Sequence, residues 1–129
     1  MLARAERLVS AADYRRVVRR GRRASGDLMT VYAVDSATDA QHPWRFGFIV
    51  SKAVGNAVTR NRVRRRLKAI SYRVLHGELS PMDDRDSALD IVFRAHAPAA
   101  AADFSVLQDQ AVSLIARAST RVRSQEPRS

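Results

Sequence analysis

The sequence predicts an α+β fold in which helices pack on a single β-sheet. Short runs of β-forming residues alternate with longer segments in which apolar residues recur every three to four positions. The segments follow one another in the order helix, strand, strand, helix, strand, helix, which is typical of a sheet with helices packed on it. The chain has 129 residues, of which 46% are hydrophobic, and this size and composition fit one domain with its own core.

A first helix is expected over residues 10–20. Ser10 and, three residues later, Asp13 have the spacing of a capping box at a helix start, and Gly21 is a typical stop. Residues 22–25 are a candidate for an additional short strand. The apolar side chains of the helix fall on one face, which consists of Tyr14, Val17 and Val18.

Three segments rich in β-forming residues predict strands over residues 28–34, 44–51 and 89–93. Gly47 lies inside the second strand and suggests either a bulge or a close approach of another group to the backbone. For Phe46, a position in the core is the preferred interpretation. The expected loops are residues 35–43 and 80–86.

A long helix is predicted over residues 57–76, with Asn56 as its cap. A closing helix is predicted over residues 103–118, and residues 119–129 are expected to form a flexible tail. The single domain is therefore expected to span residues 1–118. The apolar stripe of the long helix consists of Thr59, Val63, Leu67, Ile70 and Val74.

Charge is segregated along the chain. The formal net charge is +10, and residues 45–76 carry nine basic residues and no acid, while residues 1–26 carry eight arginines and two acids. An arginine-favouring genome raises the arginine content, but it does not gather cations into particular segments. A basic face of this kind points to nucleic acid or to anionic lipid as the partner.

The densest basic run extends from Arg60 to Lys68, where six of nine residues are cations. Like charges four positions apart on a helix cost a few tenths of a kcal/mol each, and without any Glu to offset them their sum is roughly 1 kcal/mol. A solvated face is the ordinary explanation of a charge run, but the absence of acids favours a bound polyanion. We therefore expect this helix to turn one apolar edge to its own protein and its other faces to phosphate.

Two further features are candidates for RNA contacts. Residues 51–56 lead into the basic helix, and the free N–H groups of a helix start, together with Lys52 and Gly55, would seat a phosphate. On spacing alone, an ordinary strand-to-helix turn explains this segment better. Rings on a sheet also stack on single-stranded bases, with core packing as the alternative. The rings expected near the sheet are Tyr14, Tyr32, Phe46 and Phe48.

The residues indicate no catalytic chemistry of the protein's own. There is no cysteine, and the three histidines have no spacing suited to a metal. Residues 83–86 contain three acids, for which a flexible loop is preferred over a cation site. No apolar run approaches the ~20 residues of a membrane span, and the N-terminus lacks the apolar stretch of a secretory signal. The sequence therefore predicts a protein that binds a partner and has no catalytic chemistry of its own.

Residues 45–67 carry the most specific pattern in the chain. They read Arg-Phe-Gly-Phe-Ile-Val-Ser-Lys-Ala-Val-Gly-Asn-Ala-Val-Thr-Arg-Asn-Arg-Val-Arg-Arg-Arg-Leu, with the triplet Arg60-Asn61-Arg62 after Gly-Asn-Ala-Val. This pattern resembles the signature of the protein subunit of bacterial ribonuclease P. Residues 13–21 resemble the first helix of that family, and residues 89–94 resemble its strand that ends in arginine.

The resemblance implies an α-β-β-β-α-β-α sandwich like the second domain of ribosomal protein S5, with a left-handed β-α-β crossover against the usual right-handed rule. It implies the protein component of an endoribonuclease that removes the 5′ leader of precursor tRNA. The RNA subunit would perform the hydrolysis, with Mg²⁺ held mainly by that RNA and the substrate. The implied partners are the ribonuclease P RNA subunit and precursor tRNA, with no membrane. The protein would be a monomer within a cytoplasmic ribonucleoprotein.

By position, the resemblance assigns two groups of site residues and none to catalysis or to a metal. The helix that contacts the RNA subunit contributes Arg60, Asn61, Arg62, Arg64, Arg65, Arg66 and Lys68. A cleft for the single-stranded leader contributes Tyr14, Val17, Val18, Tyr32, Phe48 and Lys52.

Two positions depart from the usual pattern of the family. Val18 stands where a second aromatic residue is common, which leaves Tyr14 as the main stacking group of the first helix. Ala53 stands where a second lysine is common, and Arg45 is a candidate replacement for that cation. Two other functions stay open on the residues alone. One is a ribosomal protein of the same fold, and the other is a DNA-binding regulator, although no helix-turn-helix precedes the basic helix.

Overall fold

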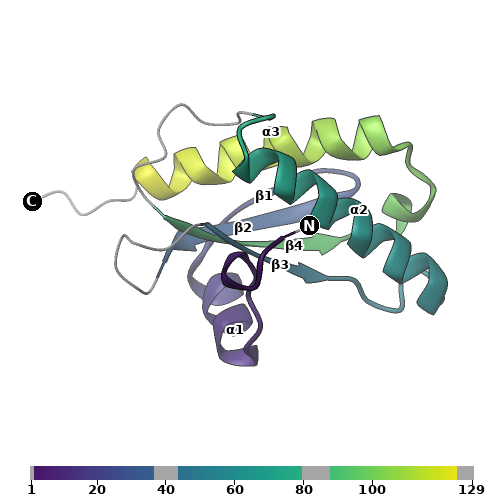
Figure 1. Cartoon of the computed structure of the whole chain (residues 1–129), viewed down its shortest axis with the longest axis horizontal. Helices are drawn as coiled ribbons and strands as arrows, with labels where there is room; N and C mark the ends of the chain where they lie inside the picture. The colour runs from purple at the N-terminus through teal and green to yellow at the C-terminus, as the bar shows by residue number, and fades with distance from the viewer. Residues whose placement is uncertain (1, 37–43, 80–87, 125–129) are drawn as a thin grey trace, which may run out of the picture.

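The protein forms one four-stranded β-sheet between two layers of helices (Figure 1). Helices α2 (Ala57–Leu75) and α3 (Phe104–Ser124) cover one face of the sheet, and α1 (Ala11–Arg20) lies on the other. The predicted α+β class is therefore confirmed. The structure is a computed structural model, and the residues that it describes are 2–36, 44–79 and 88–124.

The sheet has the strand order β1-β2-β4-β3. Neighbours β1–β2 and β2–β4 are antiparallel, whereas β3 and β4 are parallel. Parallel neighbours need a crossover, and here the chain passes from β3 through α2 to β4, the unit to which the resemblance assigns the left-handed connection. Because β1 does form, the element order is the implied α-β-β-β-α-β-α. The strands are β1 (Arg22–Ser25), β2 (Met29–Asp35), β3 (Arg45–Ile49) and β4 (Leu89–Ala95).

Alternation along the strands divides the buried side chains between two faces of the sheet. Phe46, Phe93 and Leu67 are completely buried in the larger core, between the sheet and α2 and α3. Burial of each such side chain contributes roughly 1.5–3 kcal/mol, so this layer dominates the folding free energy. The smaller cluster beneath α1 consists of Leu8, Val17, Tyr32 and Val92. Few apolar contacts hold α1, so polar contacts must contribute to its position.

The helix starts form as predicted. Ser10 Oγ accepts a hydrogen bond from the Asp13 N–H at 3.0 Å, and Asn56 Oδ1 accepts one from the Thr59 N–H at 2.9 Å. These caps satisfy backbone donors that have no partner within the helix. The buried stripe of α2 contains four of the five predicted residues, and Thr59 is half-buried. The four are Val63, Leu67, Ile70 and Val74.

The prediction that the chain frays from Ser119 is wrong for the described residues, because α3 continues to Ser124. Ser119 and Val122 are buried, and Val122 prolongs the apolar stripe of the helix by one more turn. The domain therefore extends beyond residue 118. The earlier members of the stripe are Leu107, Ala111, Leu114 and Ala118. Residues 125–129 lie outside the described residues, as do most of the predicted loops.

No pattern predicts structure before residue 10, yet the N-terminal segment is ordered against the sheet edge. It forms a short 3-10 helix, η1 (Arg4–Glu6), and a parallel bridge between Arg7 and Phe46 of β3. The Leu8 N–H donates to the Phe46 carbonyl at 2.9 Å. The segment thus covers part of the otherwise open edge of β3. In the described part of the chain, no helix has the length and apolar character that a membrane crossing requires.

Candidate nucleic-acid interface

The basic run of α2 from Arg60 to Lys68 is not neutralised by carboxylates of the described residues, although Arg73, nearer the end of the helix, lies 3.6 Å from Glu78. Within the described residues, none of the ion pairs involves a residue between Arg60 and Lys68. Of the residues predicted to contact RNA, Asn61, Arg62 and Arg65 are exposed, and the others are half-buried. The positive potential of this helix is therefore available to an external polyanion.

Two of the predicted RNA-contacting arginines also hold the fold together. Arg62 Nη2 donates to the Ala100 carbonyl at 2.9 Å, and Arg66 Nη1 donates to the Ala102 carbonyl at 3.0 Å. Both acceptors lie in or just after the second 3-10 helix, η2 (Ala97–Ala101), which leads into α3. A guanidinium group has five N–H donors, so each arginine keeps donors for phosphate. These two residues thus connect α2 to η2 in addition to supplying charge.

Arg64 and Lys68 lie on the opposite flank of α2, beside α1. They line a pocket of about 170 Å³ together with Arg7 and Tyr14. Its apolar wall consists of Leu8, Val9, Phe46 and Phe48. The three cations Arg7, Arg64 and Lys68 therefore surround a pocket to which Tyr14 contributes an aromatic ring. Because Tyr14 belongs to α1, this pocket joins the two groups of residues that were predicted to contact RNA.

Tyr14 fixes α1 to the edge strand β3. Its phenolic oxygen accepts a hydrogen bond from the Phe48 N–H at 3.0 Å. Its ring lies against Gly47, where an added Cβ would be only 2.7 Å from ring carbons. The predicted close approach at Gly47 is thus confirmed, and no other residue type leaves room for the ring at this distance.

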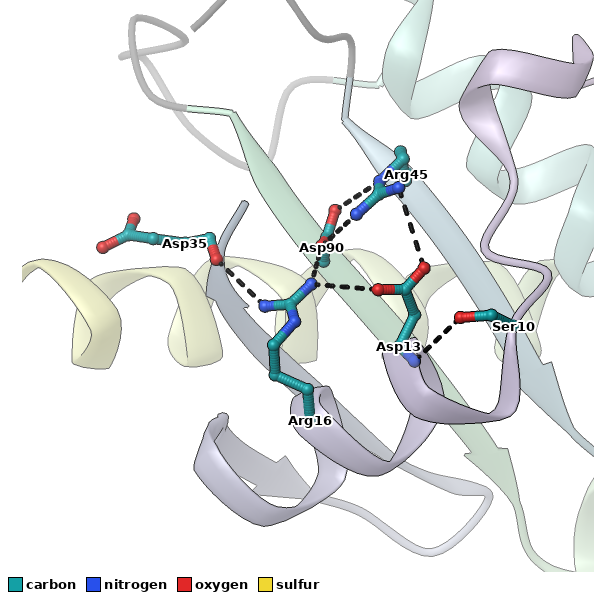
Figure 2. Close-up of polar contacts among 6 residues, drawn as sticks. All are labelled: Ser10, Asp13, Arg16, Asp35, Arg45 and Asp90. Carbon is teal, nitrogen blue, oxygen red and sulfur yellow. Dashed lines mark hydrogen bonds and ion pairs between the residues drawn. The ribbon is translucent and has the colours of Figure 1, made fainter. Parts of the chain in front are cut away.

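A cluster of charges holds the same helix on the sheet (Figure 2). The carboxylate of Asp90, in β4, is completely buried and accepts two hydrogen bonds from Arg45, at 2.9 Å and 2.7 Å. Arg16 of α1 donates to the same carboxylate. Asp13 lies 3.8 Å from both arginines. We call these four residues the Asp90 cluster; it contains two cations and two anions, so it has no net charge.

In the Asp90 cluster, the guanidinium group of Arg45 is bound to a buried carboxylate. The hydrogen bonds that Arg45 donates to Asp90 raise the pKa of Arg45, while desolvation by burial acts in the opposite direction. Arg45 therefore does not replace the cation that is missing at Ala53. Lys52 and Ala53 are exposed in the turn before α2, and Lys52 does not line the pocket beside Tyr14. A single carboxylate within the apolar strand 89–93 is the sequence signal that could have revealed this cluster.

The structure brings together only part of the predicted leader cleft. Tyr32 and the completely buried Val17 belong to the small cluster between α1 and the sheet, and Tyr14 and Val18 pack against it. Val17 therefore packs the helix on the sheet and does not form the surface. Tyr32 is 6% exposed, and the Arg94 guanidinium carbon lies 5.6 Å from the centre of its ring.

Phe48 points to the other side of the sheet. Its ring stacks on Phe93 in the larger core, with 5.7 Å between ring centres. It reaches the predicted cleft through its backbone N–H, which binds Tyr14, and it is half-buried where it borders the pocket of Arg64 and Lys68. The strand alternation that puts Phe46 in the core puts Phe48 on the same face.

Packing within the protein accounts for Gly55 in the turn before α2. A Cβ added at Gly55 would lie 2.9 Å from Thr59 Cγ2, so the first turn of the helix already occupies the space beside this glycine. Strand β3, and not another helix, precedes α2, which argues against the helix-turn-helix of a DNA-binding regulator. In the segments that the structure describes, no three Asp, Glu, His or Cys residues come together as a metal site requires.

Comparisons with known proteins agree on one family. The family model described as Ribonuclease P matches residues 2–119. The ribonuclease P protein component of Kocuria rhizophila is 40% identical over 121 residues, which cover 94% of this chain and 98% of that protein. That of Clavibacter michiganensis is 60% identical over 76 residues, which cover 59% of this chain and 66% of that protein, just under two thirds.

The solved structure of the RNase P protein of Staphylococcus aureus has the same fold. It superposes with a TM-score of 0.69 at 25% sequence identity, and the match covers 85% of this chain and 92% of that one. The likeness therefore extends over most of both chains.

Proposed function

The chain belongs to the ribonuclease P protein family, and we propose that it is the protein component of a cytoplasmic holoenzyme that removes the 5′ leader of precursor tRNA. In this proposal α2 binds the catalytic RNA subunit, and the surface between α1 and the sheet holds the leader. The hydrolysis of the phosphodiester bond is assigned to the RNA subunit. One observation carries the proposal: Arg64 and Lys68 of α2, which form no ion pair among the described residues, meet the ring of Tyr14 in one pocket.

Binding of the RNA subunit rests on charge. The basic run of α2 has no carboxylate partner among the described residues, so release of counterions from RNA supplies the driving force. If six cations of α2 each neutralise one phosphate, the logarithm of the affinity falls with the logarithm of the salt concentration with a slope of about −4 to −5.

Binding of the leader rests on the unpaired state of its bases. A ring stacks on a base whose face is free, and the faces of paired bases are already covered by their neighbours. Tyr14 is half-buried and lies beside Arg7, Arg64 and Lys68. The ring can accept a base while the cations bind the flanking phosphates. Single-stranded nucleotides at this place therefore bind better than a duplex.

The proposal assigns Mg²⁺ to the RNA subunit and the substrate, because the described residues offer no cluster of metal ligands. The protein can still raise the affinity for Mg²⁺ without binding the ion. By fixing the leader relative to the RNA subunit, it brings phosphate oxygens of both molecules together, which lowers the entropic cost of forming the metal site.

The test is reconstitution with the RNA subunit of the same organism. At low Mg²⁺ the complex should cleave precursor tRNA much faster than the RNA alone, and the protein should increase affinity for a substrate with a long leader more than for one without a leader. Two results would overturn the proposal: no rescue of cleavage at low Mg²⁺, or equal effects on both substrates. Sedimentation of the endogenous protein with a ribosomal subunit would instead favour a ribosomal function.

A further inference from the structure

Two aromatic side chains lie together at the C-terminal end of α2, beyond the basic run that is assigned to the RNA subunit. The ring centres of Tyr72 and His76 are 4.1 Å apart, with an angle of 34° between the ring planes. Among the described residues, the other ring pairs join Phe46 and Phe48 to Phe93 in the larger core, and none of these three is exposed. His76 is exposed, so the rings of Tyr72 and His76, which we call the Tyr72 pair, reach the surface.

Helical spacing places the Tyr72 pair on the same side of α2 as part of the basic run. Lys68, Tyr72 and His76 follow one another at intervals of four positions, which is one helical turn each. Arg65 is exposed and lies two turns before Tyr72, opposite the buried stripe from Val63 to Val74. At the rise of an α-helix, Arg65 and Tyr72 are about 10 Å apart along the axis, so one segment of RNA can contact both.

Packing inside the protein accounts for only part of this pair. Tyr72 is half-buried, and its side chain packs against the larger core. His76 is exposed, and its backbone N–H ends the helix by donating to the Tyr72 carbonyl at 3.0 Å. The backbone of any residue except proline can form that bond, so the end of the helix does not require an imidazole ring. A contact between side chains four positions apart also adds only slightly to helix stability.

The charges around the Tyr72 pair allow RNA to approach it. The sequence has no acidic residue between Arg45 and Gly77, and the acid that follows, Glu78, lies 3.6 Å from Arg73. The C-terminal end of a helix carries a partial negative charge, which makes it a poorer site for phosphate than the basic run. The end of α2 therefore suits the uncharged face of a base, while the basic run suits phosphates of the same RNA.

We propose that the Tyr72 pair stacks on an unpaired base of the catalytic RNA subunit and extends the interface of α2 by about two turns. This inference rests on the proposed function, in which α2 binds that RNA, and it adds a contact that does not depend on charge. An aromatic ring stacks on a base whose face is not covered by a neighbouring base. Because α2 and α1 lie on opposite faces of the sheet (Figure 1), the base is assigned to the RNA subunit and not to the leader.

The two rings have different roles in this contact. The exposed ring of His76 offers a face to the base, and the ring of Tyr72 beside it limits the rotation of the imidazole. A side chain that is already held in place loses less conformational freedom on binding. Stacking on a base releases no counterions, whereas each phosphate contact does, so this part of the affinity should not vary with salt. That difference separates the Tyr72 pair from the basic run experimentally.

The test measures equilibrium binding of the protein to the RNA subunit of the same organism, without substrate, over a range of salt concentrations. The buffer is kept at pH 8, where an ordinary imidazole is neutral. His76→Ala removes the exposed ring, His76→Phe replaces it with a ring that has no nitrogens, and Tyr72→Leu keeps an apolar side chain against the core. The matched control is Val106→Ala on α3, which shortens a side chain that is 52% exposed.

His76→Ala should weaken binding of the RNA subunit about tenfold, the order of magnitude for loss of stacking on one base. Tyr72→Leu should weaken it about threefold, because the imidazole is then less well held. Both variants should keep the salt slope of the wild type, since no phosphate contact is lost. His76→Phe and Val106→Ala should bind like the wild type. Circular dichroism and the thermal unfolding midpoint establish that the variants are folded.

Each contrary outcome has its own meaning. If the wild-type protein does not bind the RNA subunit, the proposed function itself fails. If the wild type binds and His76→Ala binds equally well, the Tyr72 pair makes no contact and this inference is wrong, while the proposed function stands. If His76→Phe binds as weakly as His76→Ala, stacking is not the cause of the loss and the inference is also wrong. If His76→Ala weakens binding of precursor tRNA to the holoenzyme but not binding of the RNA subunit, the assignment of the base to the RNA subunit is overturned.

Discussion

The Phe48 N–H donates a hydrogen bond of 3.0 Å to the phenolic oxygen of Tyr14, and this bond joins α1 to the edge strand β3. The side chain of Tyr14 thus has two roles. Its oxygen fixes the helix, while its ring borders the pocket that Arg64 and Lys68 line. Substitutions at Tyr14 can separate the two tasks, because the oxygen and the ring can be removed one after the other.

Tyr14→Phe should lower stability and leave leader binding nearly unchanged. The substitution leaves the Phe48 N–H without this partner, which costs about 1 kcal/mol, but it keeps the ring. Tyr14→Ala removes the ring as well, so affinity for precursor tRNA should fall about tenfold while affinity for mature tRNA stays the same. Urea unfolding and equilibrium binding to both tRNAs measure these effects. Equal losses of precursor affinity in the two variants would show that the ring does not stack on the leader.

Gly47→Ala should destabilise the protein through the ring of Tyr14. The new Cβ would lie 2.7 Å from ring carbons, and overpacking of this kind costs about 1–3 kcal/mol. The clash depends on the ring, so the same substitution should cost much less in a Tyr14→Ala background. A double-mutant cycle of unfolding free energies measures the difference. Additive effects would contradict the close packing of Gly47 and Tyr14.

Asp90→Asn should be the most destabilising of these substitutions. It removes the buried anion that Arg16 and Arg45 share, at a cost of about 3 kcal/mol. Because the Asp90 cluster seats α1, leader-dependent affinity should also fall, whereas affinity for the RNA subunit, which binds through α2, should change little. Asp13→Asn is the control, since its carboxylate is 3.8 Å from both arginines and only partly buried. A smaller loss in Asp90→Asn than in Asp13→Asn would refute the central position of Asp90.

The contribution of Arg45 to stability should not vary between pH 6 and pH 9, a range that lies far below any arginine pKa. The pKa of Arg45 is raised in the folded protein, chiefly by its hydrogen bond to Asp90. A raised pKa stabilises the fold at every pH below the unfolded value, and this stabilisation is lost only as pH rises through the folded value. Unfolding of wild type and Arg45→Gln at both pH values measures the contribution as a difference. If the contribution of Arg45 to the unfolding free energy decreases between pH 6 and pH 9, this prediction is wrong.

Local signals predicted local structure well. The cap at Asn56 and the stripe from Val63 to Val74 depend on residues within one helix, and both are confirmed. The predicted tail begins too early because Val122 follows Ala118 by one further helical turn, so the apolar stripe of α3 is longer than predicted. The family resemblance assigns Phe48 to the cleft, whereas its spacing from Phe46 puts both side chains on one face of β3.

Structure that depends on distant residues was harder to predict. The Asp90 cluster joins α1, β3 and β4, and its members are up to 77 positions apart, from Asp13 to Asp90. A surface groove lined by five arginines joins α1, β1, β4 and α3 in the same way. Pairing of β4 between β2 and β3 creates both neighbourhoods, and no periodicity within one segment encodes that pairing.

The two flanks of α2 should respond differently to loss of charge. R64Q/R65Q removes two cations that form no hydrogen bond to a distant element among the described residues, where Arg64 donates to Asn61 one turn earlier. Affinity for the RNA subunit should fall, and its salt slope should flatten by about two units, one for each lost phosphate contact. The unfolding free energy should stay within about 0.5 kcal/mol of wild type, because Arg65 is exposed and the half-buried Arg64 bonds within its own helix.

R62Q/R66Q is the matched comparison, since it removes the same charge from the same helix. These arginines donate to the Ala100 and Ala102 carbonyls, so the variant should lose about 1 kcal/mol of stability. Its salt slope should flatten less than that of R64Q/R65Q, because each guanidinium group directs one N–H towards η2 and fewer towards RNA. Salt titrations of RNA binding and urea unfolding measure both quantities. If R64Q/R65Q leaves the slope unchanged, Arg64 and Arg65 do not contact phosphate.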